Sequence, residues 1–311
     1  MSTSAIGIFF LFLFATSQGV RDAFFGNVFQ THSFLVVALL VFGLSCSIFA
    51  LIARVRRPGD LSRVFRSPRQ LLLMNVTTAG AWLCYLFGLR HLEPAVVATF
   101  HNGVGPMVIL AITWAGWGGR RPVISLPEGL CYVGSTLALL GLAATVLLGR
   151  SGMQVMDAGM QPVALAFVAA GGASVTVSYL CTKKFTDAGI GSESVMSTRF
   201  MLALLAAAAL HLIFGDAVGA VEIETLPWLA VAAFGLMVMP SFFVQLGVSR
   251  TSPLVAHVFR SLGPVFVFIV QQIDGRLTFS GETLICVVVF SCCTIAASVL
   301  RGWQEMRDER V

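Results

Sequence analysis

Charged residues are scarce in this chain. Asp, Glu, Lys and Arg together make up 11% of its 311 residues, whereas hydrophobic residues make up 57%. A soluble domain has about 25% charged and roughly 45–50% apolar residues. With a mean hydropathy of +0.88, the chain carries more apolar surface than a water-soluble fold can bury, so its composition excludes that class.

The signatures of common enzyme and cofactor sites are also missing. The sequence contains no HExxH, no GxSxG, no phosphate-binding P-loop and no cluster of carboxylates that could hold a metal. Its seven cysteines fall in apolar segments without a CxxC pair, which argues against a disulfide framework or a zinc site. We therefore expect no catalytic residues, no metal and no cofactor.

What the chain has instead is a series of long apolar segments. A helix of about 20 residues crosses roughly 30 Å of hydrocarbon. Segments of this kind recur along the whole length, and no polar run between them is long enough for a separate soluble domain. We predict an all-α membrane protein with ten transmembrane helices, at about 4–26, 34–53, 70–90, 94–117, 127–148, 162–181, 195–214, 227–247, 251–272 and 279–300.

The basic residues indicate how these helices are oriented. The formal charge of +5 is explained by Lys and Arg on the cytoplasmic side rather than by nucleic-acid binding. With the N-terminus inside, only Arg90, Arg150 and Arg276 fall on the outer side. The cytoplasmic side then receives Arg54, Arg56, Arg57, Arg63, Arg66, Arg69, Arg120, Arg121, Lys183, Lys184, Arg250, Arg301, Arg307 and Arg310. Both termini are predicted to be cytoplasmic.

One segment occurs twice. LFGLRHLEPAVVATFHNGVGPMVIL begins at Leu86 and QLGVSRTSPLVAHVFRSLGPVFV begins at Gln245, so that a Gly…Pro…Gly-Pro pattern recurs in the same order. We predict two related halves, residues 1–150 and 151–311, with five helices each. Because five is odd, the second half would enter the membrane upside down, which is the inverted-repeat architecture of many alternating-access transporters.

These segments resemble a known family. The GLRHLEPA and GVSRTSPL helix ends, each followed by a helix with a Gly-Pro pair, are similar to the drug/metabolite transporter superfamily in its EamA-like branch. Many members carry Trp-Gly in the first helix, where this chain has Gln18-Gly19. The resemblance covers the entire chain and implies a cavity lined mainly by spans one, three, four, six, eight and nine, with spans five and ten peripheral.

Polar residues inside the spans are the candidates for a binding site, because a charge within the bilayer costs at least about 2.5–3.5 kcal/mol and usually faces a cavity or a partner. Arg260 is the strongest candidate, since its planar, permanently charged group matches a carboxylate or phosphate. A buried interaction with Asp22 or with a helix carbonyl is the alternative. The other candidates are His101, Asn102, Gln18, Arg21, Tyr85 and Tyr179, and Asp22 and His101 are candidates for proton coupling.

Simpler interpretations stay open for several of these residues. Arg21 and Asp22 would have no role in transport if the first helix left the membrane early. His101 and Asn102 would be structural if they only formed hydrogen bonds between helices. Arg199, Lys183 and Lys184 are interpreted as anchors near the cytoplasmic ends of their helices.

Each copy of the repeated segment contains a Gly-Pro pair, Gly105-Pro106 and Gly263-Pro264. Proline removes a backbone donor and disfavours helix at the residue before it, which permits bending. The recurrence in both copies indicates a shared mechanical role, and we predict hinges at both pairs.

Together these features predict a secondary transporter of the bacterial inner membrane, working by alternating access. Cationic groups outnumber acidic ones within the membrane, which favours a small carboxylate-bearing substrate such as an amino acid or organic acid. Export of a cationic or amphipathic drug-like compound is the alternative substrate class. A passive channel and a membrane-embedded enzyme are the alternative functions. We expect membrane lipids and the substrate as partners and leave a homodimer and proton coupling open.

Overall fold

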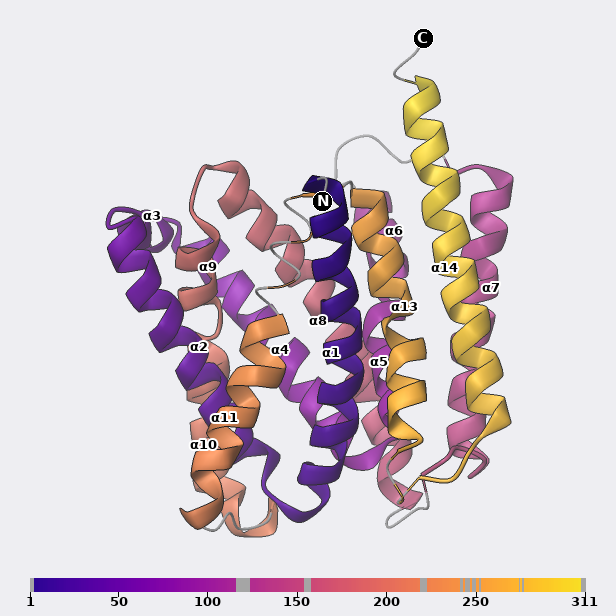
Figure 1. Ribbon diagram of the computed structural model, residues 1–311, viewed down its shortest axis with the longest axis horizontal. Helices are drawn as coiled ribbons and strands as arrows, with labels where there is room; N and C mark the ends of the chain where they lie inside the picture. Colours follow the sequence, from indigo (N-terminus) through magenta and orange to yellow (C-terminus); the bar gives the residue numbers. More distant parts are fainter. Residues whose placement is uncertain are drawn as a thin grey trace.

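The computed structural model describes residues 3–115, 124–153, 158–218, 223–240, 253–273 and 277–308, together with residues 243, 247, 250, 251 and 275. All regular elements in these ranges are helical, and Met153 and Leu277 form an isolated antiparallel bridge. The helices stand side by side in one bundle (Figure 1).

The first part of the chain forms α1 (Thr3–Thr31), α2 (Phe34–Arg56), the short α3 (Asp60–Phe65), α4 (Pro68–His91), α5 (Pro94–Gly103), α6 (Gly105–Trp114) and α7 (Leu126–Leu147). The second part forms α8 (Gln161–Asp187), α9 (Ser192–Arg199), α10 (Met201–Val218), α11 (Leu226–Ala233), a π-helical turn (Phe234–Val238), α13 (Pro253–Gln271) and α14 (Gly281–Asp308). Two short 3₁₀ turns, Ala158–Met160 and Ile223–Thr225, precede α8 and α11.

Proline and glycine mark many of the helix ends. Pro68 and Pro94 each occupy the first position of a helix, where the missing N–H is not needed for a helical hydrogen bond. Gly149 and Gly189 lie just after α7 and α8 with φ of 69° and 77°. This left-handed conformation ends a helix, and glycine adopts it without steric cost.

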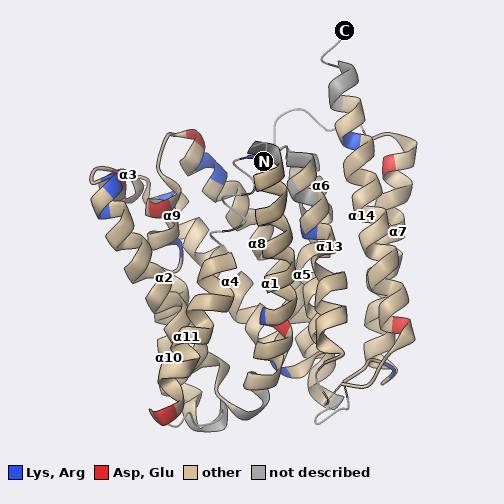
Figure 2. Cartoon of the chain, in the orientation of Figure 1, with Lys and Arg blue, Asp and Glu red and all other residues tan. Residues whose placement is uncertain are grey.

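In the described part of the chain, eight helices are long and apolar enough to cross a membrane, and two shorter apolar helices span Leu226–Val238 and Val258–Gln271. Many large apolar side chains on these helices point outward, among them Leu51, Leu205, Leu212 and Val231. Most charged residues lie near the two ends of the bundle (Figure 2). Such a surface suits lipid on its sides and water at its ends, so the chain has the features of a multi-pass membrane protein.

The bundle is held by close pairs of helices: α4 with α8, α7 with α14, α1 with α13, and α2 with α9 and α10. The largest apolar core lies where α1, α2, α4, α5 and α8 meet, and it includes Phe25, Phe42, Tyr85, Leu89 and Val168. Because α1 begins and α14 ends at the same end of the bundle (Figure 1), this end is called the terminal end below and the other the far end.

The two copies of the repeated segment differ in their helices. In the first copy the helix is interrupted at Val104, which separates α5 from α6 directly before Gly105-Pro106. In the second copy α13 continues through Pro264. The two predicted hinges therefore differ in local structure. Gly105-Pro106 follows an interruption of the helix, and Gly263-Pro264 lies within an unbroken helix.

The start of α5 lies against the end of α13. The backbone N–H of Ala95, at the start of α5, donates to Oε1 of Gln271, the last residue of α13, over 3.0 Å. The beginning of one copy therefore meets the end of the other at the far end.

Candidate functional site

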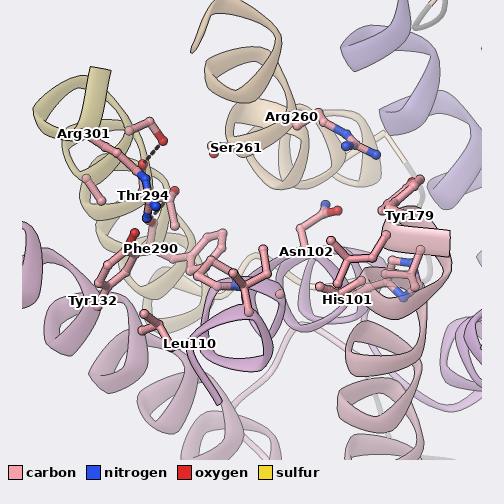
Figure 3. A pocket seen from close by; sticks show the side chains of 18 of the residues that line it. His101, Asn102, Leu110, Tyr132, Tyr179, Arg260, Ser261, Phe290, Thr294 and Arg301 are labelled. Atoms are coloured by element: carbon pink, nitrogen blue, oxygen red, sulfur yellow. Dashed lines mark hydrogen bonds between the residues drawn. The ribbon is translucent and has the colours of Figure 1, made fainter. Parts of the chain in front are cut away.

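A cavity of about 580 Å³ lies inside the terminal half of the bundle, between α5, α6, α7, α8, α13 and α14. Figure 3 shows polar side chains at two sides of it, with apolar ones between them. On one side are His101, Asn102, Tyr179 and Arg260, on the other Tyr132, Thr294 and Arg301, and between them Leu110 and Phe290. The sequence-predicted Arg260, His101, Asn102 and Tyr179 are thus brought to one wall.

Arg260 projects from α13 toward this wall. Its guanidinium carbon lies 4.5 Å from the centre of the Tyr179 ring on α8, within the range of a cation–π contact. Among the described residues no carboxylate forms an ion pair with Arg260. The alternative pair with Asp22 is not formed, because the oxygens of Asp22 are bonded to Arg21 and Tyr85. Within the described ranges, the positive charge that Arg260 brings to the cavity is therefore not compensated by a carboxylate.

His101 and Asn102 occupy the last turn of α5, just before the interruption at Val104. Nδ1 of His101 and Nδ2 of Asn102 are buried and have no hydrogen-bond partner within the described part of the chain. The interpretation as interhelical hydrogen bonds is not supported for these two atoms. Buried polar atoms without partners are rare, and at a cavity wall they are groups that a ligand can satisfy.

Two glycines of α8 allow α5 to come this close. A Cβ atom on Gly172 would lie 2.9 Å from the carbonyl oxygens of Phe100 and His101, and one on Gly171 would lie 3.2 Å from the carbonyl oxygen of Ala81 on α4. At Gly172 a side chain would force the α5 backbone to move, whereas at Gly171 the neighbouring atoms of α4 would have to shift by a few tenths of an ångström. The Gly-Gly pair therefore fixes the position of the His101 turn.

Arg21, Asp22 and Tyr85 form a separate buried cluster. Arg21 Nε donates to Asp22 Oδ1 over 2.6 Å and Arg21 Nη2 donates to the Tyr85 hydroxyl oxygen over 3.0 Å, while that hydroxyl donates to Asp22 Oδ2. The helix does not end at this cluster, because α1 continues to Thr31 and both charges are buried inside the bundle. None of the three lines the cavity.

Gln18 also lies outside the cavity lining. It is buried where α1 crosses α13, and its Oε1 is 2.9 Å from the position that a Cβ on Gly263 would take. Gly263 therefore leaves space for the Gln18 side chain. This packing explains a glycine at position 263 without requiring a hinge there. Gly105 and Pro106, in contrast, line the cavity.

Arg199 is a residue that the sequence interpretation placed wrongly. It is buried rather than an exposed anchor, whereas Lys183 and Lys184 are exposed. Its Nη2 donates to Ser178 Oγ over 3.2 Å, and its guanidinium carbon lies 5.8 Å from the centre of the Tyr179 ring. Arg199 therefore adds a second positive charge behind the wall that carries Arg260.

The opposite side of the cavity corrects a second expectation. Spans five and ten were expected to be peripheral, yet α7 contributes Tyr132 and α14 contributes Phe290, Thr294 and Arg301 to the lining, while spans one and three contribute nothing. The buried carboxylate of Glu128 accepts a hydrogen bond from Tyr132 Oη over 2.9 Å and pairs with Arg301 over 3.5 Å. No sequence motif pointed to this side.

Within the described residues, no group of three or more His, Cys, Asp or Glu side chains could hold a metal ion. The described cysteines are unpaired by disulfides. The chemistry of the cavity is thus that of guanidinium, imidazole, amide and phenol groups, which suits binding of an anion through hydrogen bonds and charge.

Comparison with known proteins supports the fold. No family model matches the chain, and no curated protein sequence is significantly similar to it. A solved structure described only as the crystal structure of a protein has 20% sequence identity to this chain and a TM-score of 0.61. The match covers 97% of this chain and 98% of the other. The fold of this chain is therefore similar to one seen in a crystal structure.

Proposed function

We propose that this chain is a secondary transporter of the EamA-like branch of the drug/metabolite transporter superfamily. It moves a small carboxylate-bearing metabolite, an amino acid or organic acid, across the bacterial inner membrane by alternating access. The observation that carries the proposal is Arg260, which faces a cavity inside the bundle without a carboxylate partner among the described residues.

The charge balance around the cavity supports an anionic substrate. Arg21 is compensated by Asp22, but Arg199 and Arg260 have no carboxylate within ion-pair distance in the described ranges. A charge that is removed from bulk water without a partner is costly. An anion bound beside Arg260 lowers this cost, whereas an ammonium group at the same place would raise it.

The neighbouring groups have distinct roles in this proposal. Arg260 binds the carboxylate through its planar N–H groups, and Tyr179 holds the guanidinium in place through its ring. The unsatisfied Nδ2 of Asn102 donates a further hydrogen bond, and His101 orients the substrate. Leu110 and Phe290 contact the apolar part of the substrate, which accommodates amino acids with apolar side chains.

The positions of the cavity and the repeated segments support alternating access. The cavity lies in the terminal half, which the distribution of Lys and Arg predicts to be cytoplasmic, and the far end is closed by contacts between the start of α5 and the end of α13. The contact between the start of α5 and the end of α13 supports the predicted inverted repeat. An inverted repeat allows one central site to face either side in turn.

A binding experiment tests the substrate class. The purified full-length protein is screened by thermal shift against amino acids, monocarboxylates, dicarboxylates and matched amines, with Arg260→Gln and the exposed-lysine control Lys183→Gln. Carboxylates should stabilise the wild type and Lys183→Gln but not Arg260→Gln. Equal stabilisation of all three proteins, or stabilisation by amines alone, would contradict the proposal and favour the drug-like cation.

Transport by a carrier is then tested with the carboxylate that gives the largest shift. Proteoliposomes loaded with the unlabelled compound should accumulate the labelled compound transiently by counterflow, which a passive channel cannot do. Recovery of a chemically altered compound would instead indicate a membrane-embedded enzyme.

A further inference from the structure

The connection between α2 and α4 carries the surplus positive charge of the chain. Residues 54–69 contain six arginines and one acidic residue, Asp60. This surplus of five equals the formal charge of the whole chain, +5, so the charges of all other residues balance one another. Basic residues gather on and beside α3, which lies in this connection at the terminal end (Figure 2). A cytoplasmic surplus of Lys and Arg sets orientation, but orientation does not require that one connection holds all of it.

The short helix α3 is fixed to the rest of the bundle along one side. Asp60 accepts a hydrogen bond from the Gly191 N–H over 2.7 Å. Val64 is fully buried in an apolar cluster with residues of α4, α8 and the segment around α9. Phe65, the next residue, is 51% exposed. The packing therefore holds α3 in place and keeps an aromatic side chain at the surface.

Three of the six arginines have carboxylate partners. Arg56 pairs with Glu193 over 3.7 Å, and both Arg57 and Arg63 pair with Asp60, over 3.9 Å and 3.0 Å. The other three are exposed and form no ion pair within the described residues: Arg54, Arg66 and Arg69. In that part of the chain, three positive charges thus remain for a partner outside the protein.

Two of these arginines end rows of outward-facing apolar side chains. On α2, the exposed Leu51 lies three residues before Arg54. On α4, the exposed Leu72 and Leu73 lie three and four residues after Arg69. Residues at these spacings share one side of a helix. On each helix a guanidinium therefore lies above apolar side chains on the lipid-facing side, as a lipid headgroup lies above its own acyl chains.

The chemistry at this level fits a phosphodiester. A guanidinium is permanently charged, and its planar N–H groups match two oxygens of a phosphate. Anionic lipids of the cytoplasmic leaflet attract basic segments next to transmembrane helices. Phenylalanine on a surface helix settles at the boundary between headgroups and acyl chains, which suits the exposed Phe65 beside Arg66. A soluble acidic protein would contact the arginines but would leave the apolar rows below them unexplained.

We propose that Arg54, Arg66 and Arg69, together with Phe65, form a binding surface for the headgroups of anionic phospholipids. The acyl chains of these lipids lie along the apolar rows of α2 and α4. The terminal end is the one that the distribution of Lys and Arg predicts to be cytoplasmic, so the lipids belong to that leaflet. None of the four residues lines the cavity, and the surface is therefore separate from the proposed substrate site.

The first test measures lipid binding to the purified full-length protein in a neutral detergent. By native mass spectrometry, the wild type should bind phosphatidylglycerol at concentrations at which zwitterionic phosphatidylcholine stays unbound. A triple variant with Arg54→Gln, Arg66→Gln and Arg69→Gln should bind phosphatidylglycerol at least about tenfold more weakly. Equal binding of the two lipids by the wild type, or wild-type affinity in the triple variant, overturns the proposal.

Single substitutions provide a matched comparison of charge. Arg69→Gln and Arg150→Gln each remove one exposed arginine, but Arg150 pairs with Glu282 and lies at the opposite end of the bundle. Arg69→Gln should weaken phosphatidylglycerol binding by about fivefold, whereas Arg150→Gln should leave it unchanged. Equal losses in the two variants would mean that only the total charge of the protein matters, which overturns a site at α3.

Inorganic phosphate separates a lipid from a free anion as the occupant. At the concentration of the lipid, phosphate should not displace phosphatidylglycerol from the wild type, because the acyl chains contribute contacts that phosphate lacks. Displacement under these conditions overturns the lipid as the occupant.

The last test locates the lipid on the wild-type protein. Phosphatidylglycerol with a photoreactive group in the acyl chain, close to the headgroup, is crosslinked to the protein in vesicles, and the labelled peptides are mapped. Labelling should include residues 51–76, and labelling confined to other parts of the chain overturns the proposal. This result needs no variant, so it decides the matter even if the triple variant does not fold. No test here uses a substrate, and the outcome is therefore separate from that for anion binding in the cavity.

Discussion

The imidazole of His101 and the phenol ring of Tyr85 lie with their centres 4.6 Å apart. Tyr85 belongs to the closed cluster with Arg21 and Asp22, whereas His101 lines the cavity. The buried cluster therefore contacts His101, a residue of the cavity wall, although none of its own three side chains lines the cavity.

The first prediction concerns this ion pair. Asp22→Asn leaves the buried Arg21 without its carboxylate, so we expect a loss of about 3–5 kcal/mol in the free energy of unfolding, the range for breaking a buried pair. The melting temperature of the detergent-solubilised protein, followed by tryptophan fluorescence, measures the change. The double variant Arg21→Leu with Asp22→Leu removes both charges and should recover part of the loss. If the single variant is as stable as the wild type, the cluster has no structural role.

The second prediction separates charge from geometry at Arg260. Lysine keeps the positive charge but loses the planar set of N–H groups and the favourable stacking on Tyr179. We expect Arg260→Lys to bind the selected carboxylate about tenfold more weakly, which corresponds to about 1.4 kcal/mol. Isothermal titration calorimetry on the purified variant gives this ratio. Wild-type affinity in the lysine variant would show that only the charge matters.

The third prediction concerns the contact between α8 and α5. Gly172→Ala places a methyl group 2.9 Å from two carbonyl oxygens of α5, so the helices must separate, at a cost of about 1–3 kcal/mol. Carboxylate binding should weaken as well, because the His101 turn moves. Gly43→Ala in α2 is the matched control, since its added Cβ meets only one side-chain atom at 3.9 Å. Equal effects of the two substitutions on binding and stability would contradict the role of Gly172.

The fourth prediction is a pH dependence at the terminal end. Asp60 of α3 accepts a hydrogen bond from the Gly191 N–H over 2.7 Å and one from Arg63 over 3.0 Å. The Gly191 hydrogen bond, together with Arg63, lowers the pKa of the Asp60 carboxyl below its usual range. The ionised form is therefore favoured in the folded state, and its contribution to stability is present above the unfolded pKa of about 3.9.

This contribution is lost as the pH falls from that value through the lower pKa of the folded state. We expect Asp60→Asn to lower the melting temperature at neutral pH and the difference from the wild type to shrink below about pH 4. Melting curves of both proteins across this range provide the test. A difference that stays constant with pH would mean that the carboxylate charge is not involved.

Part of the fold follows directly from the sequence. Apolar segments of about 20 residues predicted ten spans, and the described residues contain eight helices of that kind and two shorter apolar ones. Pro94 marks the start of α5, as expected for a proline at the first position. His101 and Arg260 each lie seven residues after the proline of their copy of the repeated segment, Pro94 and Pro253, and Asn102 follows His101. In the structure all three line one cavity.

The rest depends on contacts between distant parts of the chain. Glu93 precedes a helix-starting proline and resembles an ordinary residue of a turn, yet the hydrogen-bond partners of its carboxylate are 59 to 190 residues away. Arg199 lies near the start of its membrane segment, and only packing against α8 shows that it is buried. Local patterns carry no information about such contacts. The polar residues Ser194, Ser197 and Thr198 beside Arg199 were a signal that this helix does not face lipid at that level.

The participation of α7 and α14 in the cavity wall has a physical consequence for measurements on this protein. Both helices line the cavity with one face, and on another they expose apolar side chains such as Leu137 and Ile285. Only the thickness of a single helix therefore separates the proposed substrate from the acyl chains outside. Lateral pressure from the bilayer acts on the ligand through that layer, and we expect the apparent affinity to depend on whether the protein is held in a detergent belt or in lipid.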